Sequence, residues 1–524
     1  MRIRHWILLF GLANAALYSA LLPLWEGFDE AYHYAYVESL WQTWRLPVLG
    51  RTAIPADVLA SFPLAPVSHV VQKPIPEATS FDAWFALPRA EKERRRAELE
   101  GLHASPAATS RGNYEAHQPP LAYAILALFD WPMSRAPLLD RVLALRLIAA
   151  LCSILLIDSG TRGLAAILHL PGALTDAAVF TIFCCQMLYA TVAHVANDWL
   201  AVGLSAMILS ALARLLAKPD ARPARIAALW LAAGLVTKAY FLVFALAGAG
   251  LAAFLLWRGR VRAKTLVPAA LILAVLAGPW YARAVRLYGD VSGMTRDLDG
   301  VSVHQALAAA PHIDWLATGG YLARASLWTG NNSFTSFSRL TLNVVLALLF
   351  LAMLLWAIRI REIAPPEGMI FAVLVLFAAG IGYETCMIFA FADGEGAAAA
   401  PWYSEALLPP VLLLAYLGMS RWRTWGRMLA AATVAIWTWV LLATWALKLF
   451  PMYSSGAAGP MRVRDFWSFY TANAGKMADL SLLAPAPAPL LYAVLAMVLS
   501  LGVFLCTAVI RSVCNISMTP QSNS

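Results

Sequence analysis

The sequence predicts an all-α, polytopic membrane protein with about twelve transmembrane helices. The chain has 524 residues, of which 61% are hydrophobic and only 13% are charged, and its mean hydropathy is +0.66. This composition is too apolar for a soluble globule, so lipid must be much of its solvent. The net charge of +9 falls largely in short loops between apolar stretches. Membrane topology explains that charge better than a nucleic-acid partner does.

Residues 1–25 are expected to form the first transmembrane helix. Arg2 and Arg4 precede its apolar stretch, so a cleaved signal peptide is the alternative. An uncleaved helix is favoured because the apolar stretch continues to Trp25.

A polar insertion follows, and we expect residues 26–138 to form an extracytoplasmic loop with juxtamembrane helices. Within it, residues 88–101 predict a short soluble helix, because Glu91 precedes Arg95 by four residues and Gly101 can end the helix. Residues 117–132 hold only about eleven apolar residues between prolines, too few to span comfortably. We expect an interfacial or re-entrant helix there.

The segment 139–447 is expected to be the transmembrane core, and 488–524 the last transmembrane helix with a cytoplasmic tail. An extracytoplasmic loop, 448–487, separates them. The predicted spans lie at 139–161, 172–193, 199–216, 226–237 running into 239–256, 265–282, 340–358, 369–391, 404–419, 428–447 and 488–510. The 6 cysteines lie in apolar stretches or in the tail and predict no disulfide framework.

The basic loops predict the topology. Placing Arg162 and the loops around 214–225, 258–264, 359–361 and 421–427 in the cytoplasm satisfies the positive-inside rule at each turn. The chemically interesting residues then gather at the outer face: Asp29, Glu30, His33, Glu115, His117, His194, Asp198, Lys238, Arg283, Glu395, Trp402, Tyr403 and Glu405. The Arg- and Ala-rich composition suggests a bacterial source, so the expected location is a bacterial inner (plasma) membrane with the site facing the periplasm or exterior.

Five segments together resemble the integral-membrane glycosyltransferases of the C-type (GT-C) superfamily. They are "FDEAYHYAYVESLWQTWRLPV" (28–48), "NYEAHQPPLAY" (113–123), "AHVANDWLA" (193–201), "GLVTKAY" (234–240) and "GPWYARAVRLYGD" (278–290). The sequence is most similar to the bacterial phospholipid-carrier-dependent branch, related to protein mannosyltransferases and aminoarabinose transferases. The resemblance covers the first 290 residues well and the rest loosely.

The resemblance implies that Asp29, with Glu30 beside it, stands where such enzymes have an acidic general base for the acceptor hydroxyl. A positioned carboxylate is needed because an alcohol is a poor nucleophile. The alternative is that Asp29 only caps the helix that follows it. His33, four residues further on, shares a helix face with Asp29. An Asp/His pair for a divalent metal and an ordinary hydrogen-bonded histidine are its two interpretations.

The resemblance also implies where the donor phosphate binds. Burying the charge of Lys238 in its apolar context is costly unless the ammonium has a partner. The resemblance implies that Lys238 faces the lipid-linked phosphate. The alternative is that its side chain snorkels to the surface. His117 and Gln118 stand where related sequences often carry Lys, and Gln118 can donate to a phosphate oxygen. Arg283 either adds charge at the phosphate or anchors an interfacial helix.

The remaining site residues are assigned to the second acidic position and to the substrate cavity. Asp198 matches the family's second outer acidic position, with helix capping as its alternative. The cavity is expected to include His33, Glu115, Trp402, Tyr403 and Glu405. Trp402 and Tyr403 either stack on a sugar or belong to the interfacial aromatic belt. The arginine that related enzymes often carry in this region is absent.

The predicted function is inverting transfer of a sugar from a polyprenyl-phosphate carrier to an acceptor on the extracytoplasmic face. The expected partners are that donor, a glycan, lipid or protein acceptor, and membrane lipid, with no nucleic acid. A transporter or flippase of a lipid-linked sugar is the rival interpretation. It is less favoured because strong polar groups in the middle of spans are sparse and no inverted repeat is visible.

Overall fold

The computed structural model describes residues 2–72, 75–106, 109–291, 301–328, 336–394, 398–455, 463–473, 475–482 and 488–515. Glu395, which the sequence placed at the outer face, lies outside these residues. The regular secondary structure of the described residues is almost entirely helical, as predicted. Its strands are two residues long each, β1 (Pro66–Val67) and β2 (Thr79–Ser80), and they pair in parallel.

Within the described residues, six helices are long and apolar enough to cross a membrane. Two bent pairs of helices also qualify, which gives up to eight candidate spans if each pair counts as one span. The six are α8 (Leu138–Ile167), α11 (Asp198–Ala217), α18 (Arg339–Ile358), α19 (Pro365–Phe391), α21 (Arg423–Thr444) with its continuation through η6 (Trp445–Leu449) into α22 (Phe450–Ser455), and α25 (Ala488–Cys514). The bent pairs are α9 (Gly172–Cys184) with α10 (Gln186–Val192), at 62°, and α14 (Ala263–Leu276) with α15 (Gly278–Tyr288), at 41°.

The predicted count of about twelve spans stays a prediction. Three helices that the sequence assigned to spans are short: α12 (Ala221–Leu235), α13 (Phe241–Trp257) and α20 (Leu408–Ser420) have 15, 17 and 13 residues. The first helix, α1 (Ile3–Leu21), has 19. About 20 apolar residues are needed to cross a typical bilayer without local adjustment.

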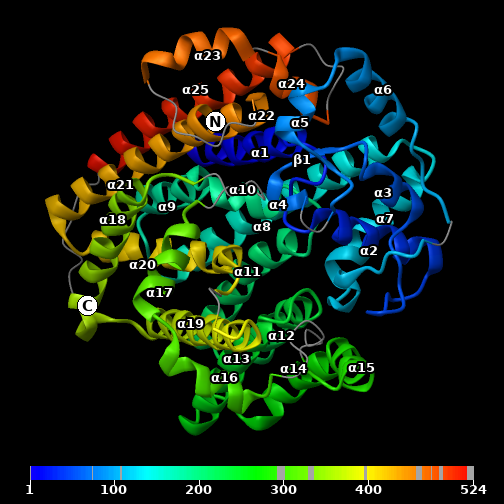
Figure 1. Cartoon of the computed structure of the whole chain (residues 1–524). Helices are drawn as coiled ribbons and strands as arrows, with labels where there is room; N and C mark the ends of the chain where they lie inside the picture. Colours follow the sequence, from blue (N-terminus) through cyan, green and yellow to red (C-terminus); the bar gives the residue numbers. More distant parts are fainter. Residues whose placement is uncertain are drawn as a thin grey trace.

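The insertion folds into its own group of helices beside the apolar body, at the right of Figure 1. Its elements are α2 (Glu30–Thr43), α3 (Ala56–Ser61), α4 (His69–Gln72), α5 (Phe81–Ala86), α6 (Arg89–Glu100), η1 (Tyr114–His117), α7 (Leu121–Asp130) and η2 (Trp131–Met133). The soluble helix predicted at 88–101 is confirmed as α6, where the Arg95 Nε lies 2.7 Å from the Glu91 Oε1. The predicted short apolar helix is confirmed as α7.

The smaller elements after the core spans connect them or cover their ends. They are α16 (Val303–Ala309), η3 (Ala310–His312), α17 (Trp315–Ala325), η4 (Ile360–Glu362), η5 (Pro401–Leu407), η7 (Val463–Asp465), α23 (Phe466–Asn473) and α24 (Lys476–Leu480).

The core is centred on α11, which packs against α8 and α12 and lies near the middle of Figure 1. In the most apolar 18-residue stretch of α11, 83% is buried inside the protein. The corresponding share is 22% for α18 and also for α25. Close packing with α8 depends on glycine: a Cβ at Gly160 would lie 2.7 Å from Ala206, and a Cβ at Gly203 would lie 2.7 Å from Leu156. Small residues at a helix crossing let the two backbones approach in this way. The N-terminus of α11 is thereby held firmly, and it carries Asp198.

Candidate active site

Asp29 lies between α1 and α2 and does not cap α2. It occupies the N-cap position, but its side chain makes no capping hydrogen bond, and its backbone is left-handed with φ of 54°. A non-glycine residue in this conformation is strained, and such strain clusters at functional sites. The Asp29 Oδ1 instead accepts a hydrogen bond of 2.6 Å from the Tyr114 hydroxyl. The Asp29 carboxylate therefore contacts Tyr114 and does not cap α2, which was one of the two interpretations from the sequence.

The pKa of Asp29 is raised above its ordinary value. Burial is the main cause, and the charge of Asp198 adds to it, while the Tyr114 hydrogen bond and the charge of Lys238 oppose the shift. A raised pKa makes the ionised form of a carboxylate a better proton acceptor than an exposed carboxylate.

Glu30 points the other way, into the protein. It forms a buried ion pair with Arg146 of α8, whose Nε lies 2.7 Å from the Glu30 Oε1. Burial alone would raise the pKa of Glu30, but the Arg146 guanidinium outweighs it and leaves the pKa below its ordinary value. The Asp-Glu pair of the sequence thus consists of a half-buried acid, Asp29, bonded to Tyr114, and a fully buried acid, Glu30, paired with Arg146.

Arg146 links the chain segments on both sides of Asp29. Besides Glu30, it donates to the backbone carbonyls of Leu22 and Pro23, each at 2.9 Å. Glu30 in turn accepts a 3.0 Å hydrogen bond from the Val195 N–H. One buried ion pair therefore joins the end of α1, the start of α2 and the segment before α11.

Lys238 lies in the turn between α12 and α13 and is only 6% exposed. It does not reach the surface, as snorkelling would require. Its ammonium forms an ion pair with Asp198 in the first turn of α11 and lies 4.4 Å from the centroid of the Tyr403 ring. Asp198 is thus a partner for Lys238. Asn197, at the N-cap position of α11, makes no side-chain cap either.

The segment 114–118, which includes η1, contacts both Asp29 and the start of α11, next to Asp198. Glu115 is buried, and burial together with the nearby charge of Asp29 raises its pKa to about 8, so Glu115 is largely protonated at neutral pH. Gln118 accepts a 3.0 Å hydrogen bond at its Oε1 from the Asn197 amide, which leaves its Nε2 as the donor side. The Nδ1 of His117 lies 2.7 Å from the Tyr114 carbonyl, so Nδ1 carries the proton, and the His117 Nε2 accepts a 3.4 Å hydrogen bond from the Gln118 Nε2.

His33 is a buried, hydrogen-bonded histidine. Its Nδ1 lies 2.8 Å from the Tyr123 hydroxyl and 3.8 Å from the Glu115 Oε2. Burial, and then the charge of Lys238, hold its pKa well below the ordinary value, so it is neutral. No group of three or more His, Cys, Asp or Glu side chains that could hold a metal ion occurs among the described residues. The hydrogen bond between Tyr123 and His33 matches the hydrogen-bonded interpretation of this histidine.

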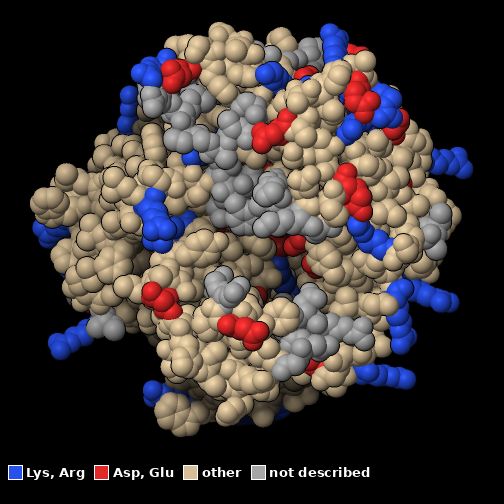
Figure 2. Space-filling view, viewed as in Figure 1, with Lys and Arg blue, Asp and Glu red and all other residues tan. Residues whose placement is uncertain are grey.

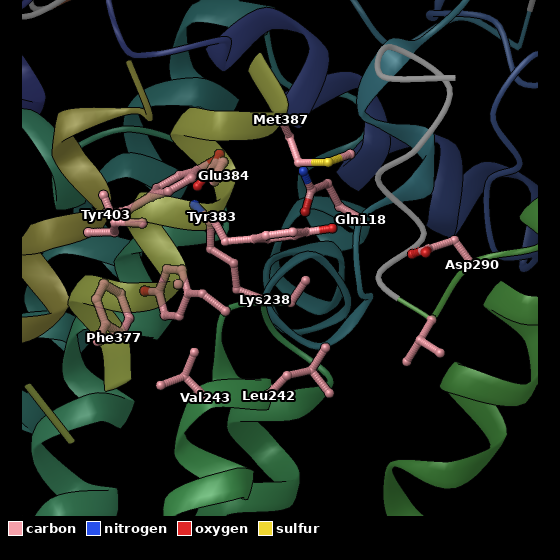
Figure 3. A pocket seen from close by; sticks show the side chains of 15 residues that line it. Gln118, Lys238, Leu242, Val243, Asp290, Phe377, Tyr383, Glu384, Met387 and Tyr403 are labelled. Carbon is pink, nitrogen blue, oxygen red and sulfur yellow. The ribbon is translucent and has the colours of Figure 1, made fainter. Parts of the chain in front are cut away.

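A cavity of about 370 Å³ opens at Lys238. Figure 3 shows Lys238 and Gln118 on its wall, with Tyr403 and Glu384 nearby. Most of the rest of the lining is apolar and comes from α13 and α19: Leu242, Val243, Phe377, Gly380, Ile381 and Met387. The face drawn in Figure 2 is hollowed near its middle, with acidic and basic atoms visible inside the hollow. Asp29 is not among the lining residues, although the charge of Lys238 acts on it.

A second cavity, of about 780 Å³, shares Glu384 and Tyr403 with the first. Its lining is more polar and includes Asp314, Thr318, Tyr321 and Trp402. Trp402 stacks on Phe28, with ring centroids 4.2 Å apart and an angle of 11° between the planes. Because Phe28 precedes Asp29, the wall of this cavity is continuous with the backbone that holds the acid.

Two predicted site residues lie elsewhere. Arg283 donates to the Pro47 carbonyl at 2.7 Å and lines a separate hollow with Arg45 and Arg286, so the described structure gives it no place at Lys238. Glu405 is 1% exposed, and the nearest partner of its carboxylate is the Cys185 thiol, at 4.0 Å. Glu405 is outside the lining of both cavities. A position near the end of a span, read from sequence, does not fix the direction of a side chain.

Several residues of the site were missed by the sequence analysis. Glu384 stands alone among apolar residues of a predicted span, and that isolation was a usable signal. Arg146 is likewise a charged residue inside a predicted span. Tyr114 has no signal of this kind, because a hydrogen bond across 85 residues of sequence leaves no local pattern.

No family model and no curated protein matches the sequence. The solved structures that are similar to it include the following two. ArnT from Cupriavidus metallidurans in the apo state matches at 14% identity with a TM-score of 0.42, covering 97% of this chain and 77% of that one. The arabinosyltransferase EmbB from Mycobacterium smegmatis matches at 14% identity with a TM-score of 0.43, covering 98% of this chain and 40% of EmbB. At this level of similarity, the function has to be argued from the site itself.

Proposed function

We propose that the protein is a membrane glycosyltransferase that moves a sugar from a polyprenyl-phosphate carrier to an acceptor hydroxyl. One observation carries the proposal: the buried ammonium of Lys238 lines a mainly apolar cavity, and its charge acts on Asp29. An ammonium in the wall of an apolar cavity suits a phosphate attached to a hydrocarbon chain. A carboxylate with a raised pKa beside it suits removal of a proton.

In the proposed reaction, Asp29 accepts the proton of the acceptor hydroxyl as its oxygen attacks the anomeric carbon. The bond between the anomeric carbon and the phosphate oxygen breaks, and the carrier leaves as a phosphate monoester. Attack from the side opposite the phosphate inverts the anomeric configuration. Tyr114 orients the Asp29 carboxylate through its hydrogen bond, so the acid is positioned before the acceptor arrives.

Lys238 would stabilise the negative charge that develops on the departing phosphate. Its ion pair with Asp198 and its contact with the Tyr403 ring hold the ammonium in the cavity wall. The Nε2 of Gln118 adds a neutral hydrogen-bond donor on the same wall. Arg283 has no part in this version of the site.

The proposed location is a bacterial inner membrane, with the site at the extracytoplasmic face. The apolar lining from α13 and α19 would hold the first prenyl units, so the carrier need never leave the bilayer. The acceptor would approach through the second cavity, whose wall leads through Trp402 and Phe28 to Asp29.

Replacing Lys238 tests the phosphate site. Lys238→Met should weaken binding of polyprenyl phosphate by about 10- to 100-fold, because a hydrogen bond to a charged group contributes about 1.5–3 kcal/mol. Affinity is measured by titrating the protein in nanodiscs with a radiolabelled polyprenyl phosphate. Lys264→Met, at an exposed position, is the control and should bind like the wild type. Equal affinity in the wild type and Lys238→Met would show that the phosphate does not bind here.

Replacing Tyr114 tests the role of Asp29 through pH. Tyr114 donates to the ionised form of Asp29 and so opposes the rise in its pKa. Tyr114→Phe should therefore move the acid limb of the pH–rate profile upward by about one pH unit, with activity above that limb largely kept. Tyr281→Phe is the control, because its hydroxyl donates to the remote Leu235 carbonyl. A limb that stays in place, or moves to lower pH, would contradict the assignment of Asp29 as the titrating base.

The rival function is transport of the lipid-linked sugar. It would use the same cavity and the same ammonium, but the label would cross the membrane while still attached to its carrier. Proteoliposomes loaded with labelled donor and supplied with an envelope extract as acceptor distinguish the two functions. Label moved from the carrier to the acceptor supports the transferase, and intact labelled carrier on the opposite leaflet, with no label on the acceptor, supports the transporter.

A further inference from the structure

Glu384 lies in the wall between the two cavities. It is on α19, one of the helices long enough to cross the membrane, and it lines both cavities together with Tyr403. Figure 3 shows it beside Tyr403 and on the same side of the cavity as Tyr383. A carboxylate inside a span is costly, so its position calls for a functional explanation.

No hydrogen bond or ion pair of the Glu384 side chain is found among the described residues. The charge of Lys238 acts on it, but the ammonium of Lys238 is paired with Asp198. Two other acids near the site do have such partners: Asp29 has Tyr114, and Glu30 has Arg146. Glu384 thus differs from them in presenting free acceptor oxygens to the cavities.

The two cavities differ in chemistry, and Glu384 stands where they meet. The cavity at Lys238 is lined mainly by aliphatic and aromatic side chains, which suit a prenyl chain, whereas the second includes Asp314, Thr318 and Tyr321. A sugar attached to a phosphate at Lys238 would lie at this junction. Sugar hydroxyls donate hydrogen bonds, and the carboxyl oxygens of Glu384 can accept them.

We propose that Glu384 determines donor specificity by accepting hydrogen bonds from hydroxyl groups of the transferred sugar. This inference rests on the proposed function. It assigns Glu384 to the sugar and Lys238 to the phosphate of the same donor. The Glu384 carboxylate also repels a nearby phosphate group, so it lowers the affinity for a polyprenyl phosphate that carries no sugar.

The opposite effects on sugar and phosphate give a sharp test. Binding of polyprenyl phosphate and of a polyprenyl-phosphate hexose is measured by titration of the protein in nanodiscs, and the ratio of the two affinities is compared among variants. Glu384→Gln keeps the shape and removes the charge. It should lower the preference for the hexose-bearing carrier about tenfold, because a charge-assisted hydrogen bond is replaced by a neutral one. Its affinity for bare polyprenyl phosphate should stay equal or rise.

Glu362→Gln is the matched control, since Glu362 is exposed and lies outside the lining of both cavities. It makes the same change of charge away from the proposed site, and its affinity ratio should equal that of the wild type. The ratio does not depend on the fraction of folded protein, so a partly unfolded variant remains informative. An unchanged ratio in Glu384→Gln would overturn the role of Glu384. A wild type that binds neither carrier would overturn the proposed function instead.

Discussion

Asp29→Asn is expected to slow sugar transfer by about 10²–10⁴-fold, the usual contribution of general base catalysis. The amide keeps the size of the carboxylate and can still accept the Tyr114 hydrogen bond, but it cannot take a proton. The affinity for polyprenyl phosphate should change little, because Lys238 and Gln118 line the proposed phosphate site and Asp29 does not. The measurement is a single-turnover rate at saturating donor.

The control for this substitution is Asp82→Asn, at an exposed position of α5 in the same insertion. It should transfer at the wild-type rate. If Asp29→Asn retained more than about a tenth of the wild-type rate, Asp29 would not be the general base. If it lost donor binding as well as rate, Asp29 would have a role in donor binding that the geometry does not give it.

Arg146→Met is expected to destabilise the protein by about 3–5 kcal/mol, because it leaves the buried Glu30 carboxylate without its partner. The side chains of Arg146 and Glu30 are both fully buried, and Arg146 also donates to backbone carbonyls at the end of α1. The free energy of unfolding is measured by titration with a denaturing detergent. Refolded Arg146→Met should also transfer sugar more slowly, because the ion pair holds Asp29 in place.

A double variant separates the buried charge from other effects of the substitution. Glu30→Gln combined with Arg146→Met removes both charges, so it should recover part of the stability that the single variant loses. Arg89→Met, which breaks an exposed ion pair of α6, should cost less than about 1 kcal/mol. A double variant no more stable than Arg146→Met would show that lost packing and backbone contacts, and not the unpaired charge, cause the destabilisation.

The sequence predicted the parts of the fold that depend on local pattern. The helix α6 follows from its i,i+4 charges and its terminal proline and glycine, and α7 follows from an apolar stretch between prolines. The break between α12 and α13 falls at Lys238, where the prediction placed two meeting spans. Hydropathy could not give the lengths or the bends of the spans, since a window average does not register the 62° turn between α9 and α10.

The candidate site depended on contacts that sequence spacing does not reveal. Lys238 and Asp198 were each singled out, but their ion pair spans 40 residues of sequence. Glu30 and Asp29 are neighbours in the chain and resembled one acidic pair; the left-handed backbone at Asp29 sends their side chains to different partners. Arg283 matched a motif, but the α15 helix that carries it packs its guanidinium against residues 46 and 47.

The central claim is that the cavity at Lys238 and the acid at Asp29 together transfer a sugar from a lipid phosphate. The most direct measurement supplies the protein in nanodiscs with a panel of radiolabelled polyprenyl-phosphate sugars and an envelope extract as acceptor, and follows the label as it leaves the carrier. The account predicts that label is transferred by the wild type, is lost in Asp29→Asn at full donor occupancy, and is reduced in Lys238→Met in proportion to donor binding. Tight donor binding with no label leaving the carrier, and no effect of Asp29→Asn, would contradict it.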